Sequence, residues 1–260
     1  MKVSVLTVAL NNERTIRQTL ESVLSQSSCN IEYILKDGGS TDKTVEIAKS
    51  YESQFREKGI DYKIIVESDQ CLYDAMNQAI AYSTGDVIGF LNSDDWYTPD
   101  CIKIVTEYFT NDQDMEVLDG SIQSWDEDGT YKVLIQSPRL RKFITSRDFR
   151  HPTLFVRKQI YEKYQYNTAL FYADFDLWIR LRKDNRKIVT VKDVLTNYRL
   201  GGVSNKGSLK EVTRRYKERR NVYKNNNLSR WYIVECIFTE YGKSIYYWMI
   251  RVKHEVFGRK

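Results

Sequence analysis

Two adjacent aspartates, Asp94 and Asp95, lie at the centre of the stretch FLNSDDWYTP, which covers residues 90–99. Neighbouring carboxylates repel each other, so a positive group beside them would offset the cost. A divalent cation is one candidate, because hard cations prefer carboxylate oxygens. In the other interpretation, one aspartate caps the helix that Thr98 and Pro99 would start and the other is solvated. These ten residues alone favour the capping interpretation.

The aspartates follow the last of four short apolar runs that alternate with helical patterns over the first hundred residues. Such alternation predicts a parallel sheet covered by helices, which is an α/β fold. We expect strands at residues 2–10, 31–37, 61–68 and 86–92, and helices within residues 11–26, 38–55 and 72–83.

Ligands of parallel sheets bind beyond the carboxyl ends of the strands, where the following loops meet. Here each of those loops is polar and contains an acidic residue: 7–13, 37–42, 67–74 and 92–95. Four acidic loops on one edge are harder to explain by capping than one loop is. Their convergence therefore favours a binding site at this edge.

The second half of the chain has a different pattern. It predicts more strands, one short strand followed by a helix, and one amphipathic helix. We expect strands at 115–125, 130–137 and within 187–200, the strand and helix at 150–164, the amphipathic helix at 173–184, and a helix break at 224–229.

Charge and cysteine content exclude several classes of protein. The net charge is +5, but residues 206–260 hold 14 Lys and Arg against 5 Asp and Glu, so the rest of the chain is acidic. A nucleic-acid-binding protein would be basic more uniformly, and we expect no nucleic-acid partner. The cysteines, Cys29, Cys71, Cys101 and Cys236, form no CxxC motif, which favours reduced thiols in a cytoplasmic protein. We also expect no signal peptide and no membrane span.

Seven motifs between residues 3 and 205 resemble, in this order, those of family 2 glycosyltransferases with the GT-A fold. They are SVLTVALNNE, YILKDGGSTDKT, ESDQCLYDAMNQAI, STGDVIGFLNSDDWY, HPTLFVRK, ADFDLWIRL and YRLGGVSN. The chain is most similar to bacterial enzymes that assemble capsule, colanic acid or O-antigen repeat units. The resemblance implies a Rossmann-like, mostly parallel central sheet flanked by helices. It also implies inverting transfer of a sugar from a nucleotide-sugar, UDP-linked in preference to GDP-linked, to a saccharide acceptor carried on a polyprenyl-diphosphate lipid.

The resemblance assigns the donor site residue by residue. Asp95 matches the aspartate that binds the metal, Mn²⁺ or Mg²⁺, and Asp94 matches the position that contacts the ribose or the metal. Asp37 matches the position that hydrogen-bonds the base, and a carboxylate there favours uracil or guanine over cytosine. The alternative for Asp37 is a role in the turn DGGSTD and its helix cap. The remaining residues assigned to the nucleotide-sugar are Thr7, Ala9, Glu13, Asp69 and Asn77.

The acceptor side is assigned in the same way. In ADFDLW, Ala173 falls on the glutamate of the family's Glu-Asp motif and Asp174 on the aspartate. Asp174 is therefore predicted to be the base that deprotonates the acceptor hydroxyl. The alternative is that Asp174 caps the helix that follows. His151, Tyr73 and Asp176 are assigned to the acceptor side of the site.

The sequence departs from the family pattern at three places. Val8-Ala9-Leu10 replaces Pro-Thr-Tyr, which removes an aromatic residue that would stack on the base. Gly201 stands where many members have a metal-contacting histidine, and the carboxylate motif is Ser-Asp-Asp in place of Asp-x-Asp. These departures imply a metal held by Asp95, the diphosphate and water.

We expect a catalytic domain at residues 1–205, with a nucleotide-sugar half up to about 97 and an acceptor half from 98. Residues 206–260 form a basic, amphipathic helical extension. One interpretation docks the extension on the anionic inner face of the cell membrane, and the other packs it on the catalytic domain or on a second subunit of a homodimer. The stripe that prompts both comprises Val234, Phe238, Tyr241, Ile245, Trp248, Val252 and Val256.

Three other functions have to be weighed against the glycosyltransferase. A sugar-phosphate nucleotidyltransferase would share the architecture and the metal, but it usually has a Gly-rich basic loop after the first strand, and NNERTIRQ is not such a loop. A dinucleotide-dependent oxidoreductase needs the motif GxGxxG after the first strand, and this sequence does not have it there. A non-enzymatic membrane adaptor that uses the basic extension stays open.

Overall fold

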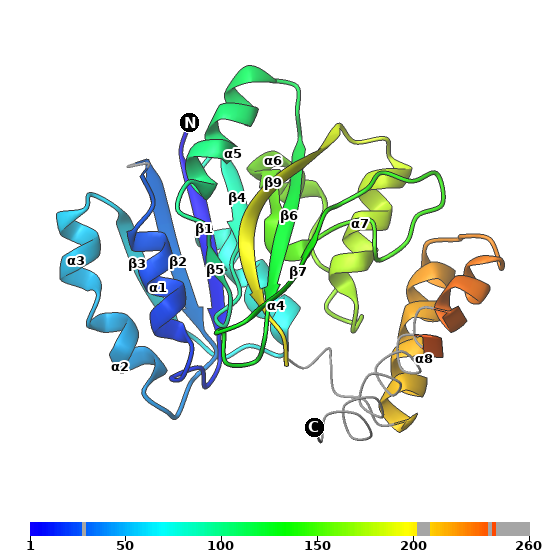
Figure 1. Ribbon diagram of the computed structural model, residues 1–260, viewed down its shortest axis with the longest axis horizontal. Coiled ribbons are helices and arrows are strands. Elements are labelled where there is room, and N and C mark those ends of the chain that lie inside the picture. The colour runs from blue at the N-terminus through cyan, green and yellow to red at the C-terminus, as the bar shows by residue number, and fades with distance from the viewer. Residues whose placement is uncertain (28–29, 202–208, 239–240, 243–260) are drawn as a thin grey trace, which may run out of the picture.

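The computed structural model describes residues 1–27, 30–201, 209–238 and 241–242. They form an α/β protein around one curled sheet with helices on both faces (Figure 1). Within these residues the sheet has nine strands in the order β3-β2-β1-β4-β8-β6-β9-β5, and β7 pairs with β6 beside this path.

The elements follow the expected alternation along the chain. The strands are β1 (Val3–Ala9), β2 (Ile31–Asp37), β3 (Asp61–Val66), β4 (Val87–Phe90), β5 (Trp96–Tyr97), β6 (Val117–Trp125), β7 (Lys132–Gln136), β8 (Leu154–Arg157) and β9 (Ile188–Arg199). The helices are α1 (Ile16–Leu24), α2 (Thr44–Lys49), α3 (Glu52–Glu57), α4 (Leu72–Tyr82), α5 (Cys101–Asn111), η1 (His151–Thr153), α6 (Lys158–Lys163), α7 (Ala173–Lys183) and α8 (Leu209–Asn225).

The first four strands form the predicted parallel sheet. β1 lies between β2 and β4, so that Leu6 is in register with Ile34 on one side and Phe90 on the other. Every residue of β1, β2 and β4 is buried. Burial on both faces explains why β1 and β4 are mostly apolar in the sequence, whereas β2 also buries the charged residues Glu32, Lys36 and Asp37.

Alternate residues of β1 supply two separate hydrophobic cores. Val3 and Val5 pack with residues of α1, α3 and α5 on one face of the sheet. Leu6 and Val8 pack with residues of α4 and α7 on the other. Successive side chains of a strand point to opposite faces, so a single strand organises both layers of helices.

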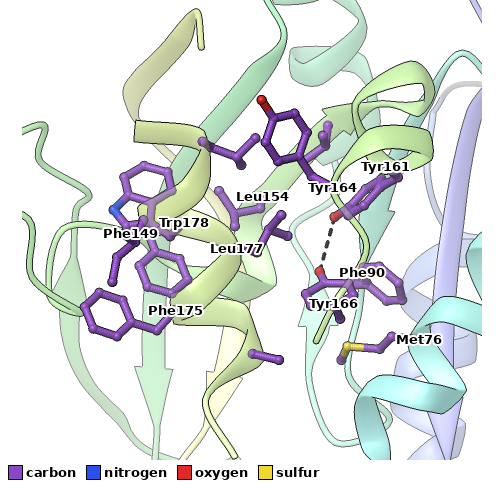
Figure 2. Close-up of a cluster of buried hydrophobic side chains, with 14 of the residues drawn as sticks. Met76, Phe90, Phe149, Leu154, Tyr161, Tyr164, Tyr166, Phe175, Leu177 and Trp178 are labelled. Carbon is purple, nitrogen blue, oxygen red and sulfur yellow. Dashed lines mark hydrogen bonds between the residues drawn. The ribbon is translucent and has the colours of Figure 1, made fainter. Parts of the chain in front are cut away.

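The second core is rich in aromatic residues where α7 lies against the sheet. Figure 2 shows Trp178 and Phe175 of α7 close to Phe149, and the ring centroids of Phe149 and Trp178 are 5.1 Å apart. On the other side of this core, the hydroxyls of Tyr161 and Tyr166 are joined by a hydrogen bond of 3.3 Å. These contacts fix α7, and therefore the residues at its N-terminus, against the sheet.

The second half of the sheet mixes strand directions. β6 is parallel to β9 and antiparallel to β7 and β8, and β8 is antiparallel to β4. β5 pairs with the end of β9, where Trp96 is opposite Asn197 and Tyr97 opposite Thr196. The sequence did not predict β5. The sequence predicted one helix within residues 38–55, and the structure has two short helices there, α2 and α3.

The helical extension packs on α7. Tyr223 of α8 meets Phe175 at 5.3 Å, and Tyr232, beyond α8, stacks on Phe143 at 3.9 Å. The predicted helix break is confirmed, because α8 ends at Asn225 and a short helix follows at 232–238. This part of the extension therefore packs on α7, whereas packing of the apolar stripe itself stays a prediction.

Only part of the predicted stripe lies in the described residues. Val234 and Phe238 are exposed, while Tyr241 is partly buried and lies 6.0 Å from Tyr216. The other members of the stripe, Ile245, Trp248, Val252 and Val256, lie outside the described residues. In the part of the chain that the structure describes, no helix is long and apolar enough to cross a membrane. The predicted boundaries at residues 97 and 205 stay predictions.

Candidate active site

Two adjoining cavities lie at the carboxyl ends of the parallel strands. The β1–β4 cavity has a volume of about 400 Å³ and is bordered by Ala9, Asp69 and Asp94. The α7 cavity has a volume of about 420 Å³ and is bordered by Asp174, His151 and Tyr73. Both are bordered by three further residues, Leu72, Asn92 and Tyr198. The two cavities together can hold a ligand with two parts, one beside the aspartate pair and one beside Asp174.

Asp95 is fully buried behind the β1–β4 cavity. Its Oδ1 accepts a hydrogen bond of 2.9 Å from the backbone N–H of Arg199, and its Oδ2 accepts one of 2.8 Å from Nδ2 of Asn92. Burial, and then the charge of Asp94, raises the pKa of Asp95 well above its ordinary value. Burial also raises the pKa of Asp94, which is partly exposed at the cavity.

The capping interpretation of this pair is wrong. The next α-helix, α5, begins at Cys101 with Asp100 at its N-cap, and no side chain makes a cap hydrogen bond there. Neither Asp94 nor Asp95 is freely solvated, since one is partly and the other fully buried. Asp94 borders the β1–β4 cavity, whereas Asp95 borders neither cavity. A cation bound at Asp94 would offset the repulsion between the two carboxylates.

Arg199 lies beside the two aspartates at the end of β9. Its Nε donates to the backbone carbonyl of Asp94 at 3.1 Å, its Nη1 donates to the carbonyl of Glu127 at 3.0 Å, and its Nη2 donates to Gln18. Its guanidinium lies 5.2 Å from the ring centre of Trp96. These hydrogen bonds hold the loop between β4 and β5 to the end of β9. The sequence contained Arg199 in the motif YRLGGVSN, but nothing there indicated this role.

The residues available for a metal are few. Among the described residues, no group of three or more His, Cys, Asp or Glu side chains is placed to hold a metal ion. Asp94 and Asp95 could supply two carboxylates, so further ligands would have to come from substrate or water. Magnesium sites that serve phosphate chemistry commonly have this composition, with one or two carboxylates and the phosphates of the substrate.

Asp37 is held by its own turn at the end of β2. Its Oδ1 accepts hydrogen bonds from the N–H groups of Gly39 (2.9 Å) and Ser40 (2.6 Å), and its Oδ2 accepts one from the Ser40 hydroxyl (2.6 Å). The turn interpretation is therefore present in the structure, and contact with a base stays a prediction. Nearby, Asp69 borders the β1–β4 cavity and forms an ion pair of 2.8 Å with buried Lys36.

The other residues assigned to the donor are placed differently. Ala9 borders the β1–β4 cavity. Thr7 is buried inside the sheet, where its Oγ1 accepts a hydrogen bond of 3.1 Å from Tyr33. Glu13 is exposed and accepts a hydrogen bond of 3.0 Å from the N–H of Lys43. Asn77 makes two hydrogen bonds to the backbone of residue 166, of 2.9 Å and 3.0 Å. Their contact with a nucleotide-sugar stays a prediction.

Asp174 lies in the first turn of α7 and borders the α7 cavity. Its Oδ1 accepts hydrogen bonds from the Tyr73 hydroxyl at 2.9 Å and from the N–H of Phe175 at 2.8 Å. The N-cap position belongs to Tyr172, so Asp174 does not cap the helix as the alternative supposed. Both hydrogen bonds hold the carboxylate through Oδ1, and the residue borders the cavity. This arrangement suits a group that must accept a proton.

His151 is partly buried at the α7 cavity, where its Nε2 lies 2.9 Å from the Tyr166 hydroxyl. Burial lowers the pKa of His151, which favours the neutral imidazole. The residues on either side of His151 are held by Asp119, a fully buried carboxylate that accepts hydrogen bonds from the N–H of Arg150 (3.2 Å) and the Thr153 hydroxyl (3.0 Å). Burial raises the pKa of Asp119 well above its ordinary value. The sequence analysis missed Asp119, although an aspartate inside the apolar run MEVLDGSIQ was a visible signal.

Asp176 makes its contacts away from the residues named around the α7 cavity. Its Oδ2 accepts a hydrogen bond of 2.8 Å from Arg180, and its Oδ1 accepts one of 2.7 Å from Asn226, just beyond α8. The side chain joins α7 to the extension. Its assignment to the acceptor side stays a prediction that these contacts do not support.

Known proteins resemble this chain in sequence and in fold. The family model described as glycosyl transferase family 2 matches residues 4–188. The putative glycosyltransferase EpsE of Bacillus subtilis is 27% identical over 76% of this chain and 73% of its own length. A PGL/p-HBAD biosynthesis glycosyltransferase of Mycobacterium tuberculosis is 28% identical over 82% of each chain.

Solved structures share the fold at low sequence identity. S. aureus TarS 1-349 in complex with UDP-GlcNAc has a TM-score of 0.65 at 18% identity, over 92% of this chain and 73% of that one. The mannosyltransferase PcManGT from Pyrobaculum calidifontis, in complex with GDP-Man and Mn²⁺, has a TM-score of 0.65 at 13% identity, over 86% of this chain and 63% of that one. The predicted GT-A fold is confirmed. Because the family model covers most of its length, the chain belongs to glycosyltransferase family 2.

Proposed function

We propose that this protein is an inverting glycosyltransferase that moves a sugar from a nucleoside-diphosphate sugar to a hydroxyl of a saccharide acceptor. The observation that carries the proposal is the pair of adjoining cavities, one at the aspartate pair and the other at Asp174. The donor would lie in the β1–β4 cavity with its diphosphate at Asp94 and Asp95. The acceptor would enter the α7 cavity.

In the reaction, the acceptor oxygen attacks the anomeric carbon and the bond from that carbon to the diphosphate oxygen breaks. Asp174 takes the proton of the attacking hydroxyl, and the nucleoside diphosphate leaves with the bonding electrons. Tyr73 and the N–H of Phe175 hold Asp174 by Oδ1. A divalent ion, Mn²⁺ or Mg²⁺ at Asp94 and Asp95, would neutralise the charge that develops on the leaving diphosphate.

The donor is a UDP-sugar in preference to a GDP-sugar. The preference for UDP comes from the resemblance of the sequence motifs. Asp37, at the end of β2, supports uracil or guanine over cytosine, because its carboxylate can accept from the ring N–H of either base. Solved proteins of the same fold are in complex with UDP-GlcNAc and with GDP-Man, so the fold accommodates both nucleotides. The acceptor is a polyprenyl-diphosphate-linked saccharide of capsule or O-antigen assembly, handled in the cytoplasm. Support for this comes from the resemblance of the sequence motifs to such enzymes.

The test compares two aspartates of one helix. Asp174→Asn keeps the shape of the side chain and removes its basicity, so transfer should fall by at least about 100-fold. Asp176→Asn is the matched control, because it makes the same change two residues later on a side chain held by Arg180 and Asn226. Transfer from labelled UDP- and GDP-sugars to lipid-linked saccharides should persist in the control. The configuration of the new bond, read by NMR, tests inversion.

Two outcomes would refute this assignment. If Asp176→Asn abolishes transfer while Asp174→Asn does not, the predicted base is the wrong residue. If the wild-type protein neither binds nor hydrolyses any nucleotide-sugar, the proposed reaction is wrong. Thermal shifts with each nucleotide detect binding independently, since a ligand stabilises the native state by mass action.

A further inference from the structure

The exposed side chains in the described part of α8 are all basic or amide, while its two glutamates, Glu211 and Glu218, are half-buried. The steps from Arg214 to Lys217, Arg220 and Lys224 are three, three and four residues, which places these cations on a single helix face. The opposite face is buried on the catalytic domain. Among the α8 side chains that the structure describes, the exposed ones are Arg214, Lys217, Arg220, Asn221, Lys224 and Asn225.

The C-terminal end of this face opens into a basic cavity. Its volume is about 670 Å³, and Arg220, Lys224 and Arg230 border it together with the polar side chains of Asn227 and Ser229. Three cations and hydrogen-bonding groups around one hollow suit a phosphate-bearing ligand.

An apolar face continues directly from this cavity. Trp231 is 74% exposed and Phe238 is 69% exposed, and Val234 and Ile237 lie exposed between them. Their segment is nevertheless anchored, because Tyr232 and Cys236 are buried in the core beneath. Large apolar side chains that project from an anchored helix indicate a surface that binds a membrane or another protein. We call the cavity cations and these residues the basic–aromatic surface: Arg220, Lys224, Arg230, Trp231, Val234, Ile237 and Phe238.

We propose that the basic–aromatic surface docks the protein on a membrane that contains anionic phospholipids. The headgroup phosphates complement the three cations, and tryptophan is a side chain that favours the boundary between headgroups and acyl chains. The exposed apolar residues would enter that boundary, as in other helices that lie in the membrane plane.

The positive charge of the basic–aromatic surface argues against a second copy of this chain as its binding partner. A symmetric dimer brings the same patch of both subunits together, so the three cations would face their own copies. A nucleic acid would complement the charge, but it offers little to the aliphatic side chains of Val234 and Ile237. The docking needs none of the residues of the active site, and it places the enzyme where a lipid-linked acceptor is found.

Sedimentation of the full-length protein with vesicles tests the proposal. Phosphatidylcholine vesicles are compared with vesicles that also contain phosphatidylglycerol, at low and at high salt. The test variant carries Arg220→Gln, Lys224→Gln and Arg230→Gln. The control variant carries Lys49→Gln, Arg56→Gln and Lys58→Gln, which remove three exposed cations on and beside α2 and α3, at the other end of the molecule (Figure 1).

We expect binding that requires the anionic lipid and weakens with salt. The test variant should bind about 100-fold more weakly, since each cation near an anionic surface strengthens binding about fivefold, and the control should bind nearly as well as the wild type. Trp231→Ala with Phe238→Ala should weaken the binding that remains at high salt. Equal melting temperatures show that the variants are folded.

Three results would overturn the proposal. They are no binding of the wild type to anionic vesicles at low salt, an equal loss of binding in test and control variants, and a dimer in solution that only the test variant disrupts. The assay contains no sugar donor, so its outcome is independent of the proposed reaction. Loss of transfer with retained vesicle binding would count against that reaction alone.

Discussion

Replacing Tyr73 with Phe removes one hydroxyl and little else. The hydroxyl donates to Oδ1 of Asp174 at 2.9 Å, while the ring stacks on Tyr166 with a centroid distance of 5.5 Å. Phe keeps the stacking and loses the hydrogen bond. Among the described residues, the N–H of Phe175 would then be the one remaining hydrogen-bond donor to Asp174, on the same oxygen. We expect the carboxylate to spend less time in the orientation that receives the acceptor proton.

The size of the effect follows from the kind of hydrogen bond. A bond to a charged group contributes about 1.5–3 kcal/mol. Each 1.36 kcal/mol of transition-state stabilisation is about tenfold in rate, so kcat should fall between about 10-fold and 160-fold. The KM for the nucleotide-sugar should change little, because Tyr73 borders the α7 cavity and not the β1–β4 cavity.

Helix α4 itself provides a matched control. Tyr82, nine residues along the same helix, also donates to a carboxylate, Oε1 of Glu67, at 2.7 Å, and it borders neither cavity. Steady-state transfer should therefore be close to wild type in Tyr82→Phe. Equal rates for Tyr73→Phe and wild type would show that the hydroxyl does not position the base. A raised donor KM with unchanged kcat would place Tyr73 on the donor side instead.

Three further predictions concern the metal, the acid stability and the sheet. Excess chelator should abolish transfer, and added Mn²⁺ should restore it in the wild type but not in Asp95→Asn; full transfer in chelator would contradict the metal assignment. Burial would raise the pKa of Glu32, but hydrogen bonds from its neighbours lower it to about 2. Its stabilisation is therefore present above the unfolded pKa of 4.5 and disappears as the pH falls towards 2. Because two of its partners are partly exposed lysines, we expect Glu32→Gln to cost about 2 kcal/mol in urea unfolding at pH 7 and little near pH 2, and a pH-independent cost would refute this. In Gly89→Ala the new Cβ would lie 2.3 Å from Cε1 of buried Phe155, so unfolding should show a loss of about 1–3 kcal/mol, and wild-type stability would show that the ring moves aside.

The first half of the fold could be predicted because its physics is local. β1 and β4 are buried on both faces, so each is a short, mostly apolar run without a helical period. β5 could not be found in this way. It has two residues, and its place in the sheet comes from pairing with Thr196 and Asn197, a hundred positions later. The sequence near Trp96 carries no sign of that partner.

In the candidate site, too, local features could be predicted from the sequence and long-range contacts could not. The order of motifs was enough to predict where Asp95 and Asp174 stand relative to the strands. The hydrogen bonds that hold them were not visible, since Tyr73 reaches Asp174 over 101 positions and the N–H of Arg199 reaches Asp95 over 104. The capping interpretation failed because it considered only the neighbours of the aspartates in sequence.

The pairing of β5 with β9 has a consequence for the order in which the protein becomes functional during synthesis. Strands β1 to β4 and the helices between them end before residue 91, and their contacts are available as soon as that segment has left the ribosome. Asp95 lies just beyond, yet the N–H group that orients it and the strand that fixes β5 belong to residues 196–199. We therefore expect a nascent chain of about 150 residues to carry an ordered parallel sheet in which Asp95 is held by Asn92 and Thr19 but lacks the hydrogen bond to its Oδ1. The aspartate pair would reach its final geometry only when β9 has been synthesised.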